Sequence, residues 1–128
     1  MTTYLSVTEV KAIHLAVVIL FGGYQHGDGI RDLSALEAAV NRLQNGYYAD
    51  FTEEAAALLE SLLINHPFVD GNKRTAFAAC DIFLRLNGQC IHGDPAQLHQ
   101  LVMDWIAAVP EHRFARINED LRRIITSP

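Results

Sequence analysis

The sequence is short of lysine, of cysteine and of long apolar runs. Only two of its ten basic residues are lysines, Lys11 and Lys73, and fifteen acidic residues leave a formal net charge of −5. This balance argues against a general nucleic-acid binder, which presents a basic face. The longest apolar run, 15–21, has seven residues, whereas a membrane-spanning helix needs ~20. We therefore expect no membrane span and no direct contact with nucleic acid.

Cysteines and targeting signals are equally scarce. Cys80 and Cys90 are too few for a disulfide framework or a cysteine-rich zinc site. Cys80 lies in an apolar stretch, which is typical of a buried small hydrophobe. Residues 1–4 place no basic segment ahead of an apolar one, so we expect no signal peptide. These features predict a cytoplasmic protein with one domain over 1–128.

Helical patterning, by contrast, covers most of the chain. Half of the residues are hydrophobic, and apolar side chains recur at spacings of three and four. The first helix follows a capping box formed by Ser6 and Glu9. We expect Asp32, Thr52 and Asp94 to cap the second, third and fifth helices. The expected helices cover about 7–21, 33–43, 53–65, 72–86, 95–109 and 113–126.

The helix that begins near Asn72 is apolar on almost every side, which is typical of a helix at the centre of a bundle. The segment 89–92 is the one extended piece, at most a small edge strand. The sequence therefore predicts an all-α fold: a compact bundle of six helices around a buried central helix, with at most one very short strand.

One segment departs from this plain pattern. The nonapeptide HPFVDGNKR, residues 66–74, links two strongly apolar helices. A helix that opens at its Gly71-Asn72 pair presents backbone N–H groups that attract anions. Lys73 and Arg74 add positive charge at the same place.

Two further residues of the nonapeptide suit phosphate chemistry. Asp70 is a candidate magnesium ligand, because Mg²⁺ typically binds one or two carboxylates plus phosphate oxygens. His66 is a candidate general base, because imidazole titrates near neutrality. Together the residues predict phosphoryl or nucleotidyl transfer to a hydroxyl. Taken singly, Asp70 also suits a helix cap, and a histidine at a helix end is more often structural.

The nonapeptide resembles the signature of Fic/Doc proteins, His-x-Phe-x-(Asp/Glu)-Gly-Asn-(Gly/Lys)-Arg. Segments 29–33 and 36–40 also resemble the early part of death-on-curing (Doc) toxins. This resemblance implies that His66 deprotonates a target hydroxyl, that Asp70 coordinates magnesium and that Phe68 anchors the loop. The residues assigned to nucleotide binding are Gly71, Asn72, Lys73 and Arg74.

Two positions set the expected subclass. AMP-transferring Fic proteins have glycine where this chain has Lys73, and a second arginine where it has Phe77. Lysine intrudes on the pocket that glycine leaves open, and phenylalanine supplies no phosphate ligand. Doc-type toxins share both departures. The resemblance to them implies a reversed nucleotide that presents its γ-phosphate to the hydroxyl.

The resemblance thus implies the toxin of a type II toxin–antitoxin pair. It implies a protein serine/threonine kinase that uses ATP and Mg²⁺, phosphorylates a threonine of elongation factor Tu and stops translation. It also implies a Phd-like antitoxin as partner, and the chain has no inhibitory (Ser/Thr)-x-x-x-Glu-(Gly/Asn) sequence of its own. Two alternatives stay open: an AMP transferase, and a catalytically silent module that acts by docking.

Residues outside the nonapeptide allow weaker predictions. Arg31 and Asp32 either face the cleft and position a target, or form a loop-end ion pair in which Asp32 caps a helix. His14 is expected in the core or at its boundary, and Trp105 in the core. The other histidines show no zinc-site spacing. The last helix has a basic face, expected to be a solvated surface or a partner contact, made by Arg113, Arg116, Arg122 and Arg123.

Overall fold

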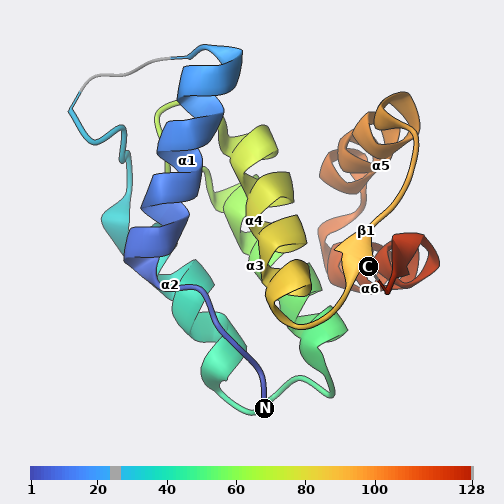
Figure 1. Cartoon of the computed structure of the whole chain (residues 1–128). Coiled ribbons are helices and arrows are strands. Elements are labelled where there is room, and N and C mark those ends of the chain that lie inside the picture. The colour runs from blue at the N-terminus through green and yellow to red at the C-terminus, as the bar shows by residue number, and fades with distance from the viewer. Residues whose placement is uncertain (24–26, 128) are drawn as a thin grey trace.

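Six α-helices and one short 3₁₀ helix make up most of the computed structural model, which describes residues 1–23 and 27–127 (Figure 1). The all-α prediction is therefore confirmed. None of the described helices is long and apolar enough to cross a membrane. The helices are α1 (Val7–Phe21), α2 (Leu33–Asn41), η1 (Arg42–Gln44), α3 (Phe51–Asn65), α4 (Asn72–Leu86), α5 (Pro95–Ala107) and α6 (Pro110–Ile124).

Side-chain caps fix several helix starts as predicted. Ser6 and Glu9 form a reciprocal capping box at the start of α1. Asp32 accepts a hydrogen bond from the third residue of α2 at 3.0 Å, and Asp94 accepts two at the start of α5. Each carboxylate also lies at the positive end of its helix dipole, where negative charge is stabilising.

The start of α3 differs from the prediction, because Thr52 does not cap it. Asp50 is the N-cap, and its carboxylate accepts from the N–H of Glu53 at 3.0 Å. Thr52 is buried inside the first turn instead. Both residue types cap well, but a carboxylate adds a favourable interaction with the helix dipole. Asp50 therefore sets the boundary of α3.

The C-terminal region holds a strand that the sequence prediction missed. α6 begins at Pro110, since proline suits the first position of a helix, and it ends at Ile124. The next two residues form β2 (Ile125–Thr126), which pairs antiparallel with β1 (Cys90–Ile91). The prediction allowed at most one very short strand, because the partner segment was assigned to the last helix.

The basic face of α6 is bonded within the fold. Arg113 donates to the carbonyl of Trp105 at 2.8 Å, and Arg122 pairs with Asp50 at 3.0 Å. The remaining two arginines of the helix pair with carboxylates on α5 and α6. Arg116, Arg122 and Arg123 are nevertheless exposed, so this surface is solvated, as predicted, while its charges are paired within the fold.

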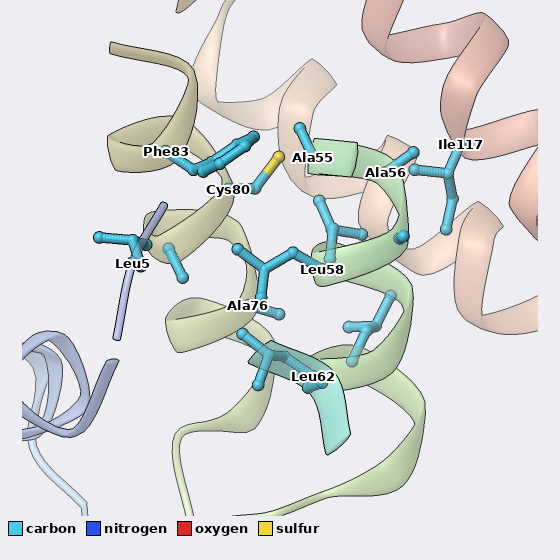
Figure 2. Close-up of a cluster of buried hydrophobic side chains, with 14 of the residues drawn as sticks. Leu5, Ala55, Ala56, Leu58, Leu62, Ala76, Cys80, Phe83 and Ile117 are labelled. Carbon is cyan, nitrogen blue, oxygen red and sulfur yellow. The ribbon is translucent and has the colours of Figure 1, made fainter. Parts of the chain in front are cut away.

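The hydrophobic core lies between α3 and the helices packed on it (Figure 2). From α3 come Leu58 and Leu62, each 1% exposed, and from α4 come Ala76, Cys80 and Phe83, all fully buried. Burying a leucine or phenylalanine side chain stabilises the fold by about 1.5–3 kcal/mol. This packing fixes the relative positions of α3 and α4, and with them the segment that joins the two helices.

The most buried helix is α3, although the apolar pattern favoured the helix that begins at Asn72. α3 packs against α2, η1, α4 and α6. Its polar side chains can be buried because they have partners: Glu54 accepts from the hydroxyl of Tyr4, and Ser61 accepts from Arg42 at 2.9 Å. α4 packs closely on α3 and α1, but more of its length is exposed.

Trp105 and Cys80 are core residues, as predicted. Both are fully buried, and Trp105 Nε1 donates to Asp120 Oδ2 at 2.8 Å. Burial raises the pKa of the Cys80 thiol, which keeps it protonated and unreactive. Cys80 and Cys90 are free thiols.

Candidate functional site

The segment 66–71, called here the motif loop, joins α3 to α4. His66 directly follows α3 in the left-handed conformation, with φ at 47°. Gly71 is the N-cap of α4 and is also left-handed, with φ at 77°. The left-handed region costs a non-glycine residue about 1–2 kcal/mol, so surrounding contacts must hold His66 in place.

Arg31 supplies such contacts from outside the loop. Its Nε donates to the carbonyl of His66 at 2.6 Å, and its Nη2 donates to the carbonyl of Asn65 at 2.7 Å. The guanidinium thus satisfies the last carbonyls of α3 and opposes the negative end of its dipole. Asp32 caps α2, as one of the two predictions for this pair expected. Arg31 bonds instead to the main-chain oxygens of Asn65 and His66. Sequence reasoning missed this role, because side-chain chemistry does not reveal a main-chain partner.

Phe68 fixes the middle of the motif loop. Its side chain is 1% exposed, as expected for an anchor, and its backbone forms an antiparallel bridge with Ile30. The Asn72 amide bonds to the same residue twice: Oδ1 accepts from the N–H of Phe68 at 3.0 Å, and Nδ2 donates to its carbonyl at 2.9 Å. The Asn72 side chain therefore braces the loop.

A cavity of about 420 Å³ opens on the motif loop, within the ~300–1,000 Å³ typical of small-molecule sites. Val17 and Phe21 of α1 also line it. Every site residue predicted from the sequence lines this one cavity: His66, Asp70, Gly71, Asn72, Lys73 and Arg74.

The positive charge of the cavity comes from the first turn of α4. Lys73 and Arg74 are exposed, and no ion pair joins either to another described residue. The Arg74 guanidinium lies 4.2 Å from the centroid of the Phe21 ring, a cation–π contact that holds it at the cavity wall. The N-cap Gly71 has no side chain to satisfy the first N–H groups of the helix. Charge and helix dipole therefore favour an anion here.

Asp70 is the only acidic residue among the described residues that line this cavity. Its Oδ1 accepts from the N–H of Gly71 at 2.8 Å, and a Cβ at Gly23 would lie 3.3 Å from its Oδ2. Glycine at 23 thus keeps a side chain away from the carboxylate. No group of three or more His, Cys, Asp or Glu able to hold a metal ion occurs in residues 1–23 and 27–127. The donor set fits Mg²⁺ held by one carboxylate and by phosphate oxygens, and it does not fit a closed zinc site.

A second cavity, of about 490 Å³, adjoins the first between α4 and α5. The two share Val17, Phe21, Lys73 and Arg74 as a wall. Phe77 lines only the second cavity, where it contributes apolar surface. The position that carries arginine in AMP-transferring Fic proteins thus adds no charge to the anion site.

Comparisons with known proteins point to one family. The sequence model of a family described as Fic/DOC matches residues 4–84. A protein named Toxin Doc from Mycolicibacterium smegmatis is 43% identical over 99 residues, which cover 73% of this chain and 72% of that protein. A protein named Protein kinase doc from Escherichia phage P1 is 31% identical over 128 residues, 97% of each chain.

Proposed function

Because the chain belongs to the Fic/DOC family, we propose that it is the toxin of a type II toxin–antitoxin pair and a protein serine/threonine kinase. The observation that carries this proposal is the cavity in which His66, Asp70 and the two bases of α4 meet. The names of the two relatives, a Doc toxin and a Doc protein kinase, support its two parts.

His66 acts as the general base in this reaction. The target hydroxyl gives its proton to the imidazole as its oxygen attacks the γ-phosphorus of ATP. The bond from the γ-phosphorus to the bridging oxygen breaks, and ADP leaves. This role is supported by the position of His66 in the cavity lining and by its left-handed backbone at the end of α3, which Arg31 braces.

The first turn of α4 binds the phosphates. Lys73 and Arg74 supply charge, and Gly71 lets the phosphates approach the backbone because it has no side chain. Asn72 contributes its backbone N–H, since both polar atoms of its amide bond to Phe68. Asp70 would hold Mg²⁺, which supplies neutralisation of the charge on the phosphate oxygens when bound.

Lys73 and Phe77 favour transfer of the γ-phosphate over transfer of AMP. The lysine side chain occupies space in the phosphate cavity that glycine would leave open, and Phe77 adds no cation. Replacing Lys73 by glycine should therefore raise the ratio of AMP transfer to phosphate transfer. An unchanged ratio would assign the choice of phosphorus to another residue.

The proposed protein substrate is elongation factor Tu, modified at a threonine, and the proposed regulator is a Phd-like antitoxin. An apolar surface beside the site supports a protein partner. Ile19, Leu20 and Phe21, at the end of α1, are 63%, 75% and 62% exposed. Adjacent exposed apolar residues of this kind mark interaction surfaces.

The proposal is tested with ATP labelled at either phosphate. Wild-type protein, Mg²⁺ and purified elongation factor Tu are incubated with γ-labelled or α-labelled ATP, beside the His66→Ala variant. We expect label on the factor from the γ position only, and none with the variant. Label from the α position alone would establish AMP transfer instead. Growth inhibition by folded His66→Ala equal to that of wild type would favour the binding-only module.

A further inference from the structure

A buried histidine outside the nonapeptide contacts the motif loop. His14 lies in α1 and is 4% exposed. Its ring stacks on Phe68 with centroids 3.9 Å apart and planes within 4°. Its Nε2 lies 2.9 Å from the main-chain carbonyl oxygen of Asp70. Because a carbonyl can only accept a hydrogen bond, Nε2 carries the proton in this contact.

The backbone around His14 is shaped to its ring. A Cβ added at Gly29 would lie 2.8 Å from His14 Cε1, closer than packed carbon atoms come. A Cβ at Gly71 would lie 3.8 Å from His14 Nε2. Two segments that are distant in the sequence, the one around Gly29 and the motif loop at Phe68 and Gly71, thus enclose one imidazole. This enclosure uses both the flat shape of the ring and its N–H group.

Two of the hydrogen bonds at Asp70 act on a single peptide unit. The carbonyl of Asp70 and the N–H of Gly71 belong to the same planar group. His14 Nε2 holds the carbonyl, and the Asp70 Oδ1 accepts from the N–H at 2.8 Å. A rotation of this peptide plane would break the hydrogen bond from His14 to the carbonyl. It would also turn the Asp70 carboxylate, because its Oδ1 is bonded to the N–H of the same plane.

We propose that His14 is a positioning residue for the candidate magnesium ligand. It fixes the plane of the Asp70–Gly71 peptide and, through that plane, the direction of the Asp70 carboxylate and the start of α4. His14 itself does not line the phosphate cavity. The consequence for metal binding rests on the proposed function, whereas the consequence for the peptide plane does not.

Two variants separate the ring from the hydrogen bond. His14→Phe keeps an aromatic face against Phe68 but has no donor for the Asp70 carbonyl. His14→Gln keeps an N–H donor and loses the ring. Val10→Ala is the matched control, because Val10 is fully buried one turn earlier on the same helix and its truncation also destabilises the core.

The first readout is the hydrogen exchange rate of the Gly71 amide, measured by NMR without ligand. We expect about tenfold faster exchange in His14→Phe, the size expected for loss of one hydrogen bond. His14→Gln should recover most of the protection. Val10→Ala should leave the Gly71 rate relative to the other amides of α4 unchanged. Wild-type exchange in His14→Phe, or equal acceleration in Val10→Ala, would overturn the proposal.

The second readout is binding of Mn²⁺ with ATP, measured by calorimetry. We expect His14→Phe to weaken Mn²⁺ binding about tenfold, with recovery in His14→Gln and no change in Val10→Ala. Unchanged Mn²⁺ binding in His14→Phe would overturn the link to the metal ligand. A wild-type protein that binds no Mn²⁺ with ATP would instead count against the proposed function, and the Gly71 exchange rates would still decide the positioning role.

Discussion

The basic residues of α6 and those in the first turn of α4 are used in opposite ways. On α6, all four arginines bond to the fold: Arg113 binds carbonyls, and Arg122 binds the carboxylate of Asp50. At the start of α4, Lys73 and Arg74 form no ion pair with any residue that the structure describes, and they line a cavity. A fold with net charge −5 thus leaves these two cations without a carboxylate partner among the described residues, at the wall of the candidate site.

The largest expected effect comes from replacing His66, the proposed general base. His66→Ala should lower the rate of phosphate transfer by roughly 10²–10⁴-fold, while the thermal midpoint stays near that of wild type because His66 is exposed. Labelled-ATP assays and thermal unfolding measure the two quantities. His112→Ala, at another exposed histidine, which lies on α6, should change neither. Phosphate transfer by His66→Ala at the wild-type rate would contradict a catalytic role for this cavity.

Replacing Arg74 and replacing Arg122 should have opposite effects on ATP affinity and on stability. Arg74→Ala should weaken ATP binding about 10–100-fold, since hydrogen bonds to charged groups contribute ~1.5–3 kcal/mol, with little change in stability. Arg122→Ala should leave ATP binding unchanged and lower the free energy of unfolding by up to ~1 kcal/mol. Calorimetry and urea titration test both variants. The distinction between the two regions fails if both variants lose the same affinity.

Arg31 is an intermediate case, since its partners are main-chain atoms of the site itself. Arg31→Ala removes the bonds to the carbonyls of Asn65 and His66. We expect kcat to fall roughly tenfold and the free energy of unfolding to fall by ~1–2 kcal/mol. The KM for ATP should not change, because Arg31 does not line the phosphate cavity. Steady-state kinetics separate these terms, and a rise in KM alone would contradict a role through His66.

The smallest expected effect concerns Asp50, which caps α3 and pairs with Arg122. Partial burial alone would raise the Asp50 pKa, but bonds from Arg122 and from the N–H of Glu53 outweigh it and lower the pKa. A lowered Asp50 pKa stabilises the fold at pH values above the ordinary pKa of a carboxyl. This contribution is lost as the pH falls through the lowered pKa of the folded state.

Asp50→Asn tests this sign, because asparagine still caps a helix but carries no charge. The variant should lose up to ~1 kcal/mol of unfolding free energy at pH 7. The difference from wild type should shrink as the pH falls below ~4. Urea titrations across this range measure it, and a difference that does not depend on pH would contradict the pairing.

The features that the sequence predicted are those fixed by neighbouring residues. The capping box at Ser6 and the cap at Asp94 depend on contacts within one turn, so their spacing is readable. The prediction of Thr52 as the cap of α3 is wrong, because Asp50, two residues earlier, accepts the capping bond and its carboxylate also interacts with the helix dipole.

Features that depend on distant partners were not predictable in this way. β2 exists because it pairs with Cys90 and Ile91, which lie more than thirty residues earlier. His14 reaches a carbonyl 56 residues away, and Arg31 reaches one 35 residues away. The nonapeptide identified residues that line the cavity. The contacts that His14 and Arg31 make with the motif loop could be found only from the three-dimensional structure.

Transfer of the γ-phosphate by this cavity is tested most directly by mass spectrometry of cellular proteins after expression of the wild type and of His66→Ala. We expect one target peptide that gains the mass of a single phosphoryl group with the wild type and not with the variant. A gain equal to AMP would contradict transfer of the γ-phosphate. Growth arrest without any modified peptide would contradict catalysis by this cavity.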